Sequence, residues 1–337
     1  MINIFDGHND VLLRLWLAGD DKGAGYIKGM DTHIDAIKAR KGGLAGGFFA
    51  IFTPQQNASG DAVLGTDPVA MADALNATNA MMDIFKTLAR HGDVMRECHT
   101  AEDVQTAMVD GVMAGILHIE GAEAIAPDLS NLDDFYSRGL RSIGPVWSRS
   151  NAFGHGVPFG FPGSPDQGQG LTEAGKDLVR ACDAMGIMLD LSHLNEKGFW
   201  DIARLSTRPL VATHSNVHHL SASPRNLTDR QLQAIAESNG LVGLNFASGF
   251  LRDDGLKTAT TPISIMIDHL SYLLDHLGED GVALGSDFDG AIIPQDIGDA
   301  AGLPKLIAAM EAADYGQEVI NKICHQNWLK MIAQQIG

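Results

Sequence analysis

The chain has 337 residues, of which 45% are hydrophobic and 20% are charged. This composition can bury a large core and excludes wholesale disorder, and the length is too great for a small disulfide scaffold. The 42 acidic and 24 basic side chains give a formal net charge of -18. Binding to nucleic acid or to an anionic membrane surface needs the opposite sign, so we expect neither as a partner.

Targeting and redox features indicate a cytoplasmic protein. The first ten residues lack both the basic and the apolar segment of a signal peptide. No later stretch has the ~18 uncharged apolar residues of a membrane-spanning helix. The three cysteines, Cys98, Cys182 and Cys324, are far apart and odd in number, which argues against a structural disulfide.

Eight short apolar runs alternate with longer amphipathic segments along the chain. We expect these runs to be strands, at residues 2–6, 46–52, 112–119, 140–147, 186–192, 209–213, 240–246 and 281–286. Thr100 and Thr172 precede helical patterns between the strands, and Gly186 ends the second of these patterns. Thr228 forms a capping box with Gln231 at the start of another helix.

A strand followed by a helix, repeated eight times, predicts a parallel sheet closed into a (β/α)8 TIM barrel. Periodicity alone leaves a doubly wound open sheet as the alternative. The sequence contains no evident linker, so we expect residues 1–337 to form a single domain. Residues 149–171 hold six glycines and three prolines. We expect a long loop there, on the C-terminal face where barrel enzymes build their active sites.

His8 and Asp10 form an H-x-D pair directly after the first expected strand. Residues two apart in an extended chain point to the same side, so both side chains could face one metal ion. Two further H-x-D pairs, at 33–35 and 91–93, lie in helical patterns. We interpret those two pairs as parts of solvated helix faces.

Metal-competent side chains also end four other expected strands, namely Glu120, His193, His214 and Asp287. A lone residue of this kind is more often a helix cap or a solvated loop residue. Polar residues at five strand ends, which a barrel would bring together, are hard to explain as caps. Three histidines and three carboxylates fit a hydrolytic zinc site, and a bridging carboxylate would make that site binuclear.

Three other histidines compete with this assignment. His118 lies two residues before Glu120 and could share its face, while His218 and His219 closely follow the sixth strand. We interpret His118 as a satisfied core histidine because it lies inside an apolar run, and the other two as surface residues. The sequence has no G-x-S-x-G, no P-loop lysine motif and no G-x-G-x-x-G after a strand, so no other catalytic motif competes.

Six motifs occur in order from the first expected strand to the eighth: DGHND at 6–10, IEG around Glu120, DLSH at 190–193, THSN at 213–216, SPRN at 223–226 and GSDFDG at 285–290. With these motifs the chain resembles the membrane (renal) dipeptidase family of the amidohydrolase superfamily. The match covers nearly the whole chain. The resemblance implies a (β/α)8 barrel that holds a binuclear zinc centre.

The resemblance also implies which residues bind metal. His8 and Asp10 would bind one zinc ion, His193 and His214 would bind the other, and Glu120 would bridge the two. Two zinc ions lower the pKa of a bridging water toward neutrality and so supply a hydroxide, while one ion polarises the scissile carbonyl.

On the substrate side, the resemblance implies that Asp287 is the general acid and base and that Arg225 holds the substrate's carboxylate. Trp147 stands where the family usually has a histidine that helps to bind the substrate. His155, in the nearby Gly/Pro-rich loop, is a candidate replacement. Phe250 stands where a tyrosine is common, so both departures concern the substrate pocket.

These features predict a zinc-dependent dipeptidase that hydrolyses short peptides with a free carboxylate through a metal-bridging hydroxide. The family often accepts a D-residue at the C-terminal position. One alternative keeps the metal site but takes N-acyl amino acids or other small amides. Another is a metal-bound barrel that binds a peptide or metabolite without turning it over. Family members often form homodimers, so the resemblance allows a homodimer here.

Overall fold

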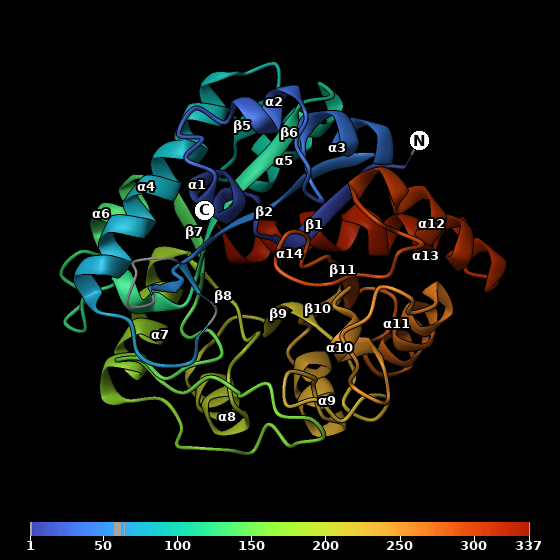
Figure 1. The fold of residues 1–337 in the computed structure, drawn as a ribbon. Coiled ribbons are helices and arrows are strands. Elements are labelled where there is room, and N and C mark those ends of the chain that lie inside the picture. Colours follow the sequence, from blue (N-terminus) through green and yellow to red (C-terminus); the bar gives the residue numbers. More distant parts are fainter. Residues whose placement is uncertain (1, 57–61, 64, 337) are drawn as a thin grey trace.

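Eight parallel strands form a closed barrel in the computed structural model, which describes residues 2–56, 62–63 and 65–336 (Figure 1). The strands of the barrel are β1 (Ile4–Asn9), β2 (Leu44–Phe52), β6 (Met113–Glu120), β7 (Leu140–Gly144), β8 (Met188–Leu189), β9 (Val211–Ser215), β10 (Leu241–Asn245) and β11 (Val282–Gly285). They pair in the orders β1-β2-β6-β7-β8 and β11-β10-β9. Parallel bridges from Asp190 to Val211 and from Asn9 to Phe288 join the two groups. The predicted barrel is therefore confirmed.

Helices connect the strands and form an outer layer around them (Figure 1). They are α1 (Val11–Leu17), α2 (Ala24–Lys28), α3 (Ala36–Gly42), α4 (Met71–Arg90), α5 (Ala101–Val109), α6 (Leu132–Ser137), α7 (Glu173–Met185), α8 (Glu196–Leu205), α9 (Asp229–Glu237), α10 (Ser248–Leu251), α11 (Ile263–Leu277), α12 (Leu303–Ala312), α13 (Gln317–Asn321) and α14 (Asn327–Gln335). Thr100, Thr172 and Thr228 cap α5, α7 and α9 as predicted, and the first and last of these caps are full capping boxes. Gly186 ends α7 in the left-handed conformation.

Several short elements were not predicted from the sequence. β3 (Gln55–Gln56) pairs with β4 (Ala62–Val63) in an antiparallel hairpin, and β5 (Met95–Glu97) pairs with the start of β6. A π-helical turn over Lys322–Gln326 leads into α14. Within the part of the chain that the structure describes, no helix combines the length and apolarity needed to span a bilayer.

Two of the strands that extend further than the sequence predicted carry histidines of interest. β1 runs to Asn9, so His8 lies inside the strand, and β9 runs to Ser215, so His214 does too. Every residue of both strands is buried. The polar residues at these strand ends remain in the ladder because they face a buried site.

The H-x-D pair at 33–35 is not part of a solvated helix, and our interpretation of it was wrong. His33 lies in a bend, and Asp35 caps the start of α3 by accepting hydrogen bonds from the backbone N–H groups of Ile37 and Lys38. Asp35 is buried as a result. The pair at 91–93 follows the end of α4 and is exposed, as predicted for a solvated position.

α14 closes the N-terminal end of the barrel. Its Trp328 is fully buried against Phe5 of β1 and Phe48 of β2, and the ring centroids of Phe48 and Trp328 are 5.3 Å apart. The indole N–H of Trp328 donates a 2.9 Å hydrogen bond to the carbonyl oxygen of Leu284 in β11. The barrel is thus packed solid below the site rather than open as a pore.

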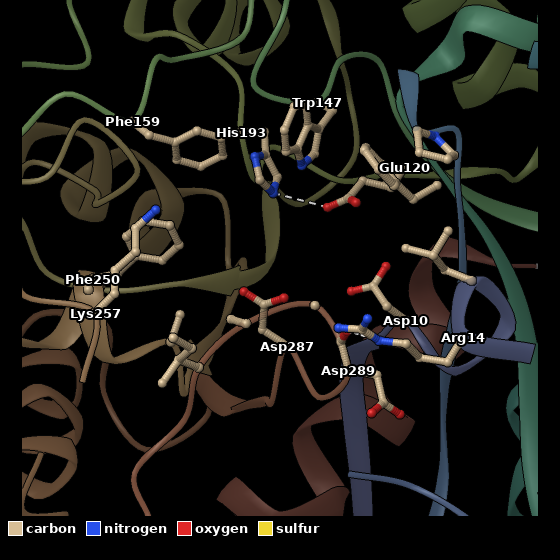
Figure 2. Close-up of a pocket in the computed structure, with 18 of the residues that line it drawn as sticks. Asp10, Arg14, Glu120, Trp147, Phe159, His193, Phe250, Lys257, Asp287 and Asp289 are labelled. Atoms are coloured by element: carbon tan, nitrogen blue, oxygen red, sulfur yellow. Dashed lines mark hydrogen bonds and ion pairs between the residues drawn. The ribbon is translucent and has the colours of Figure 1, made fainter. Parts of the chain in front are cut away.

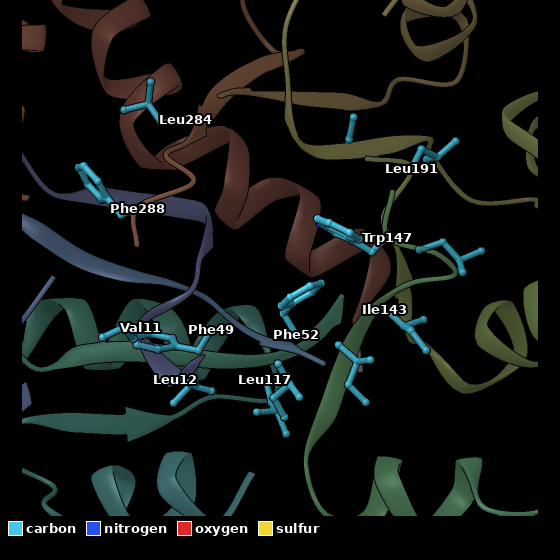
Figure 3. Packing of buried hydrophobic residues seen from close by; sticks show 14 of the residues in the cluster. Val11, Leu12, Phe49, Phe52, Leu117, Ile143, Trp147, Leu191, Leu284 and Phe288 are labelled. Atoms are coloured by element: carbon cyan, nitrogen blue, oxygen red, sulfur yellow. The ribbon is translucent and has the colours of Figure 1, made fainter. Parts of the chain in front are cut away.

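A second apolar layer lies between the strands and the helices. Figure 3 shows Phe49 of β2 and Leu117 of β6 beside Val11 and Leu12 of α1. All four side chains are fully buried or nearly so. Because both faces of these parallel strands are covered, their sequences are almost continuously apolar, which is the signal that revealed them.

The loop over 149–171 is tied to the body of the protein. The Arg149 guanidinium forms a buried 2.7 Å ion pair with Glu123. At its far end, the backbone N–H of Leu171 donates a 2.8 Å hydrogen bond to Asp201, and Asn195 donates to the carbonyl oxygen of Gln169 at 2.6 Å. These contacts fix the loop at the C-terminal face of the barrel.

Close packing of strands predicts that Gly285 cannot carry a side chain. A methyl group there would overlap the backbone carbonyl of Thr213 in β9. We expect Gly285→Ala to lower the free energy of unfolding by about 1–3 kcal/mol, since overpacked cores cost this much. Gly92→Ala is the matched control, because nothing lies within 4 Å of its added methyl group. Urea denaturation would test this, and equal midpoints for the two variants would contradict it.

Candidate metal centre and substrate cavity

Imidazole and carboxylate groups converge at the C-terminal end of the barrel around one oxygen of Glu120. Its Oε1 atom lies 3.5 Å from His8 Nε2, 3.0 Å from His193 Nε2 and 3.4 Å from His214 Nε2. Asp10 Oδ2 lies 3.5 Å from the same nitrogen of His8. The structure therefore brings together all five residues that the sequence singled out as metal ligands.

Two overlapping groups in this cluster could each hold a metal ion. One consists of His8, Asp10 and Glu120, and the other of Glu120, His193 and His214, with the ligand atoms of each group within 4.8 Å of one another. All five residues are buried. A third group of this kind consists of His8, Asp190 and His214, so it takes one histidine from each of the other two groups.

Hydrogen bonds to Nδ1 orient two of the histidines. The Ser148 hydroxyl lies 2.8 Å from His193 Nδ1, and the Thr213 hydroxyl lies 2.8 Å from His214 Nδ1. Thr213 also donates a 2.6 Å hydrogen bond to Asp190. These contacts leave Nε2 of each ring directed at the cluster, as supporting residues do around metal sites. Sequence reasoning missed Ser148 and the role of Asp190, although both lie next to strand-end motifs.

Three residues at the site have backbone conformations that residues other than glycine rarely adopt. His193, Asp287 and Asp289 have φ angles of 67°, 57° and 71°, in the left-handed region that favours glycine. Such conformations cost free energy and persist only where surrounding contacts impose them. Here they lie within a few residues of β8 and β11, and the Asp289 carboxylate accepts hydrogen bonds from the backbone N–H groups of His33 and Ile34.

Burial and crowding set the charges of the cluster. Burial raises the pKa of Glu120 to about 8. Burial alone would lower the pKa of His8, but the carboxylates of Glu120 and Asp10 outweigh it and raise that pKa to about 10. Burial lowers the pKa values of His193 and His214 well below the ordinary range, which keeps both rings neutral.

The donor set fits metal ions. Both ring nitrogens of His8 are buried without a hydrogen-bond partner among the described residues, although carboxylates surround its Nε2. Neutral imidazoles and carboxylates are the ligands that a hydrolytic zinc site uses. A cation between these groups would take the place of the protons that Glu120 and His8 otherwise hold.

Asp287 lies beside the cluster and borders the cavity. Its Oδ2 atom accepts a 2.9 Å hydrogen bond from the side-chain amide of Asn245 in β10. Burial raises the pKa of Asp287. The side chain is 9% exposed, so it can reach a molecule in the cavity.

Arg225 is buried and is not among the described residues that line the cavity. Its guanidinium donates a 3.0 Å hydrogen bond to the carbonyl oxygen of His214, while its Nε is buried without a partner among the described residues. Burial lowers the pKa of Arg225, and the carboxylates of Asp287 and Glu120 oppose that shift. The guanidinium of Arg225 adds positive charge near the carboxylates of Asp287 and Glu120.

A cavity of 580 Å³ opens above the cluster. Its floor includes Asp10, Glu120, His193 and Asp287, and aromatic residues form much of its wall: Phe52, Trp147, Phe159 and Phe250 (Figure 2). This volume lies within the range of small-molecule sites, and apolar walls with a few polar groups are typical of them.

The residues predicted for the substrate pocket divide between cavity and loop. Trp147 and Phe250 line the cavity. His155 is not among the described residues that line it, and its Nδ1 instead lies 2.7 Å from the Ser150 hydroxyl. From the same loop, Phe159 lines the cavity in place of His155. The presence of an aromatic residue in this Gly/Pro-rich loop was the sequence signal that could have revealed the role of Phe159.

The competing histidines take other positions. His118 is fully buried in the barrel, where its Nδ1 lies 2.9 Å from the Ser142 hydroxyl and its Nε2 lies 3.7 Å from Asp190. His218 bonds the carbonyl oxygen of Gly163, and His219 is exposed. None of the three belongs to the candidate metal groups found among the described residues.

A parallel barrel with histidines and carboxylates clustered at its C-terminal end defines a metal-dependent hydrolase. The chain matches the membrane dipeptidase family, peptidase family M19, over residues 1–336 and belongs to that family. It is therefore an enzyme that hydrolyses peptide bonds, and the family's metallopeptidase chemistry implies bound metal ions. This membership favours the enzyme interpretations over a barrel that only binds its ligand.

Similar proteins agree with this assignment. A crystal structure of a metallopeptidase from Rhodobacter sphaeroides, liganded with a phosphinate mimic of the dipeptide L-Ala-D-Ala, is 50% identical, covers 99% of each chain and has a TM-score of 0.95. The crystal structure of the dipeptidase AC, of family M19, is also 50% identical, covers 100% of this chain and 99% of that chain, and has a TM-score of 0.94. A dipeptidase from Claviceps purpurea is 25% identical over 98% of this chain and 76% of its own.

The protons held by the cluster predict a linkage between metal binding and pH. At pH 7 the metal-free protein keeps Glu120 largely protonated and His8 charged, because their pKa values are about 8 and about 10. Zinc binding should therefore release roughly one to two protons per chain and weaken as the pH falls. Calorimetry in buffers of different ionisation enthalpy would measure this release. Heats that do not depend on the buffer would contradict it.

Proposed function

We propose that the protein is a zinc-dependent dipeptidase that cleaves dipeptides with a free carboxylate, including those with a C-terminal D-residue. The observation that carries the proposal is the sharing of Glu120 Oε1 by three histidines at the floor of a cavity suited to a dipeptide. The Rhodobacter sphaeroides peptidase, at 50% identity, was solved with a mimic of L-Ala-D-Ala, which supports a substrate of this size and configuration.

We assign two zinc ions to the two overlapping groups. His8 and Asp10 would hold one ion, His193 and His214 the other, and Glu120 would bridge both. Bound zinc would supply a hydroxide nucleophile near neutral pH and would polarise the scissile carbonyl. The sharing of one buried carboxylate between the two groups supports a binuclear rather than a mononuclear centre.

In this proposal Asp287 moves the proton. Its carboxylate would take a proton from the nucleophile and deliver it to the leaving amine, as a general base and then a general acid. Asn245 holds Oδ2 at 2.9 Å, which leaves Oδ1 for the proton transfer. The raised pKa of Asp287 suits this task, because a carboxyl group with an ordinary pKa would release its proton too readily to donate it near neutral pH.

Arg225 and Trp147 would bind the substrate. The unpartnered Nε of Arg225 and the charge of its guanidinium favour a carboxylate on the cavity floor. Trp147 packs against Phe52 and Phe159, with ring centroids 4.9 and 5.2 Å away, and offers an apolar wall above His193. His155 has no place in this proposal, because it is held by Ser150 outside the cavity wall.

The aromatic wall also supports a second candidate substrate. An N-acyl amino acid carries the same carboxylate and a scissile amide, and its acyl chain would pack against Phe52, Trp147 and Phe159. The metal ligands and Asp287 would act in the same way. The two candidates differ in the group on the acyl side of the scissile bond. In a dipeptide this group is an amino acid with a free amine, and in an N-acyl amino acid it is an acyl group without one.

A substrate panel tests the proposal. We expect the purified enzyme to hydrolyse L-L and L-D dipeptides faster than N-acetyl amino acids, and to contain two zinc ions per chain by metal analysis. Removal of zinc with a chelator should abolish turnover, and added zinc should restore it. Faster turnover of the acetylated compounds would favour the acylase, and no hydrolysis of either class would overturn the dipeptidase proposal.

Replacing Asp287 with Asn should lower kcat by roughly 10²–10⁴-fold, the usual effect of losing a general acid-base group. Metal content should stay nearly unchanged, because Asp287 belongs to none of the candidate metal groups found among the described residues. Asp268→Asn, in the exterior helix α11, is a control for the loss of one carboxylate. Unaltered turnover in the Asp287 variant would remove the assigned role.

A further inference from the structure

We propose that Lys257 forms a subsite that favours an acidic side chain on the C-terminal residue of the substrate. The inference rests on the proposed dipeptidase function and adds a substrate class to it. The positively charged ammonium group of Lys257 borders the cavity, although the protein as a whole has a net charge of -18.

The two basic residues among the described cavity-lining residues differ in what they contact. The Nε of Arg14 donates a 2.7 Å hydrogen bond to the carbonyl oxygen of Asp289. Lys257 lies on the opposite side of the cavity, beside Phe159 and Phe250 (Figure 2). Within the described ranges its ammonium has no carboxylate or hydrogen-bond partner, so its charge is available to a ligand.

Packing holds the lysine side chain in place. Its Nζ lies 5.3 Å from the ring centroid of Phe159, in a cation–π contact. Its stem runs over Gly249, where an added Cβ would lie 2.9 Å from the lysine Cγ. The missing side chain at Gly249 thus provides the space that brings this lysine to the cavity.

Aromatic rings connect the proposed carboxylate site to the lysine. The Arg225 guanidinium carbon lies 5.3 Å from the Phe250 ring, and the Phe250 and Phe159 rings stack with centroids 6.2 Å apart. A residue whose main-chain carboxylate lies near Arg225 would extend its side chain along these rings. The side chain would then meet the Lys257 ammonium near the mouth of the cavity.

This arrangement suits aspartate or glutamate at the C-terminal position. Their methylene groups would contact the aromatic faces, and their carboxylate would pair with the lysine. Lys257 is exposed, so solvent screens the pair and the gain is modest. We expect a preference of roughly two- to fivefold for the charged side chain over its amide, which should shrink as salt is added.

The test compares substrates that differ only in charge. The kcat/KM ratio of L-Ala-Asp to L-Ala-Asn would be measured with the C-terminal residue in whichever configuration the enzyme turns over. We expect a ratio of roughly two to five in the parent enzyme and near one in Lys257→Met. Lys257→Arg should keep the preference, and Lys41→Met, which removes an exposed charge in α3, should not alter it.

A ratio that is the same in the parent enzyme and in Lys257→Met would overturn the inference while the dipeptidase proposal stands. A preference that appears instead for Asp-Ala over Asn-Ala would overturn the placement at the C-terminal residue. Failure to hydrolyse any dipeptide would count against the proposed function itself, so the two failures are distinguishable.

Discussion

The buried carboxylate of Glu120 is the constraint on which the site depends. A carboxylate removed from water costs several kcal/mol unless opposite charge or hydrogen-bond donors surround it. Here three imidazole nitrogens lie within 3.5 Å of one of its oxygens, and two other carboxylates lie nearby. These buried carboxylates are stable only when protons or cations balance their charge. Metal ions bound between them would provide that balance.

The rest of the barrel serves to hold that group in place. Strands β1, β6 and β9 deliver His8, Glu120 and His214 from inside the ladder, where hydrogen bonding fixes the backbone. His193 and Asp287 instead reach inward through left-handed turns beyond their strands. The packed interior around Trp328 supports the floor from below. Precision at the site thus comes from secondary structure and its immediate ends, while the aromatic wall comes partly from a loop.

Much of this could be predicted from the sequence, for identifiable reasons. Doubly buried parallel strands leave continuous apolar runs, so all eight were found, and a barrel then requires their polar ends to meet. The limits of the strands were less predictable, because a polar residue such as His214 can stay in the ladder when it faces a buried site. Contacts between distant segments left no local signal, which is why the position of Arg225 outside the cavity lining was not foreseen.

The closure of the barrel has a consequence for biosynthesis. The candidate site combines His8 and Asp10 from the first strand with Asp287 beyond the last one, and the bridge from Asn9 to Phe288 joins these ends of the barrel. In a nascent chain the five candidate metal ligands are all present once His214 has been synthesised, whereas Asp287 follows β11 and is the last part of the candidate site to emerge. On the proposed role of Asp287, the proton-transfer group joins the metal ligands only when the last strand closes the ring.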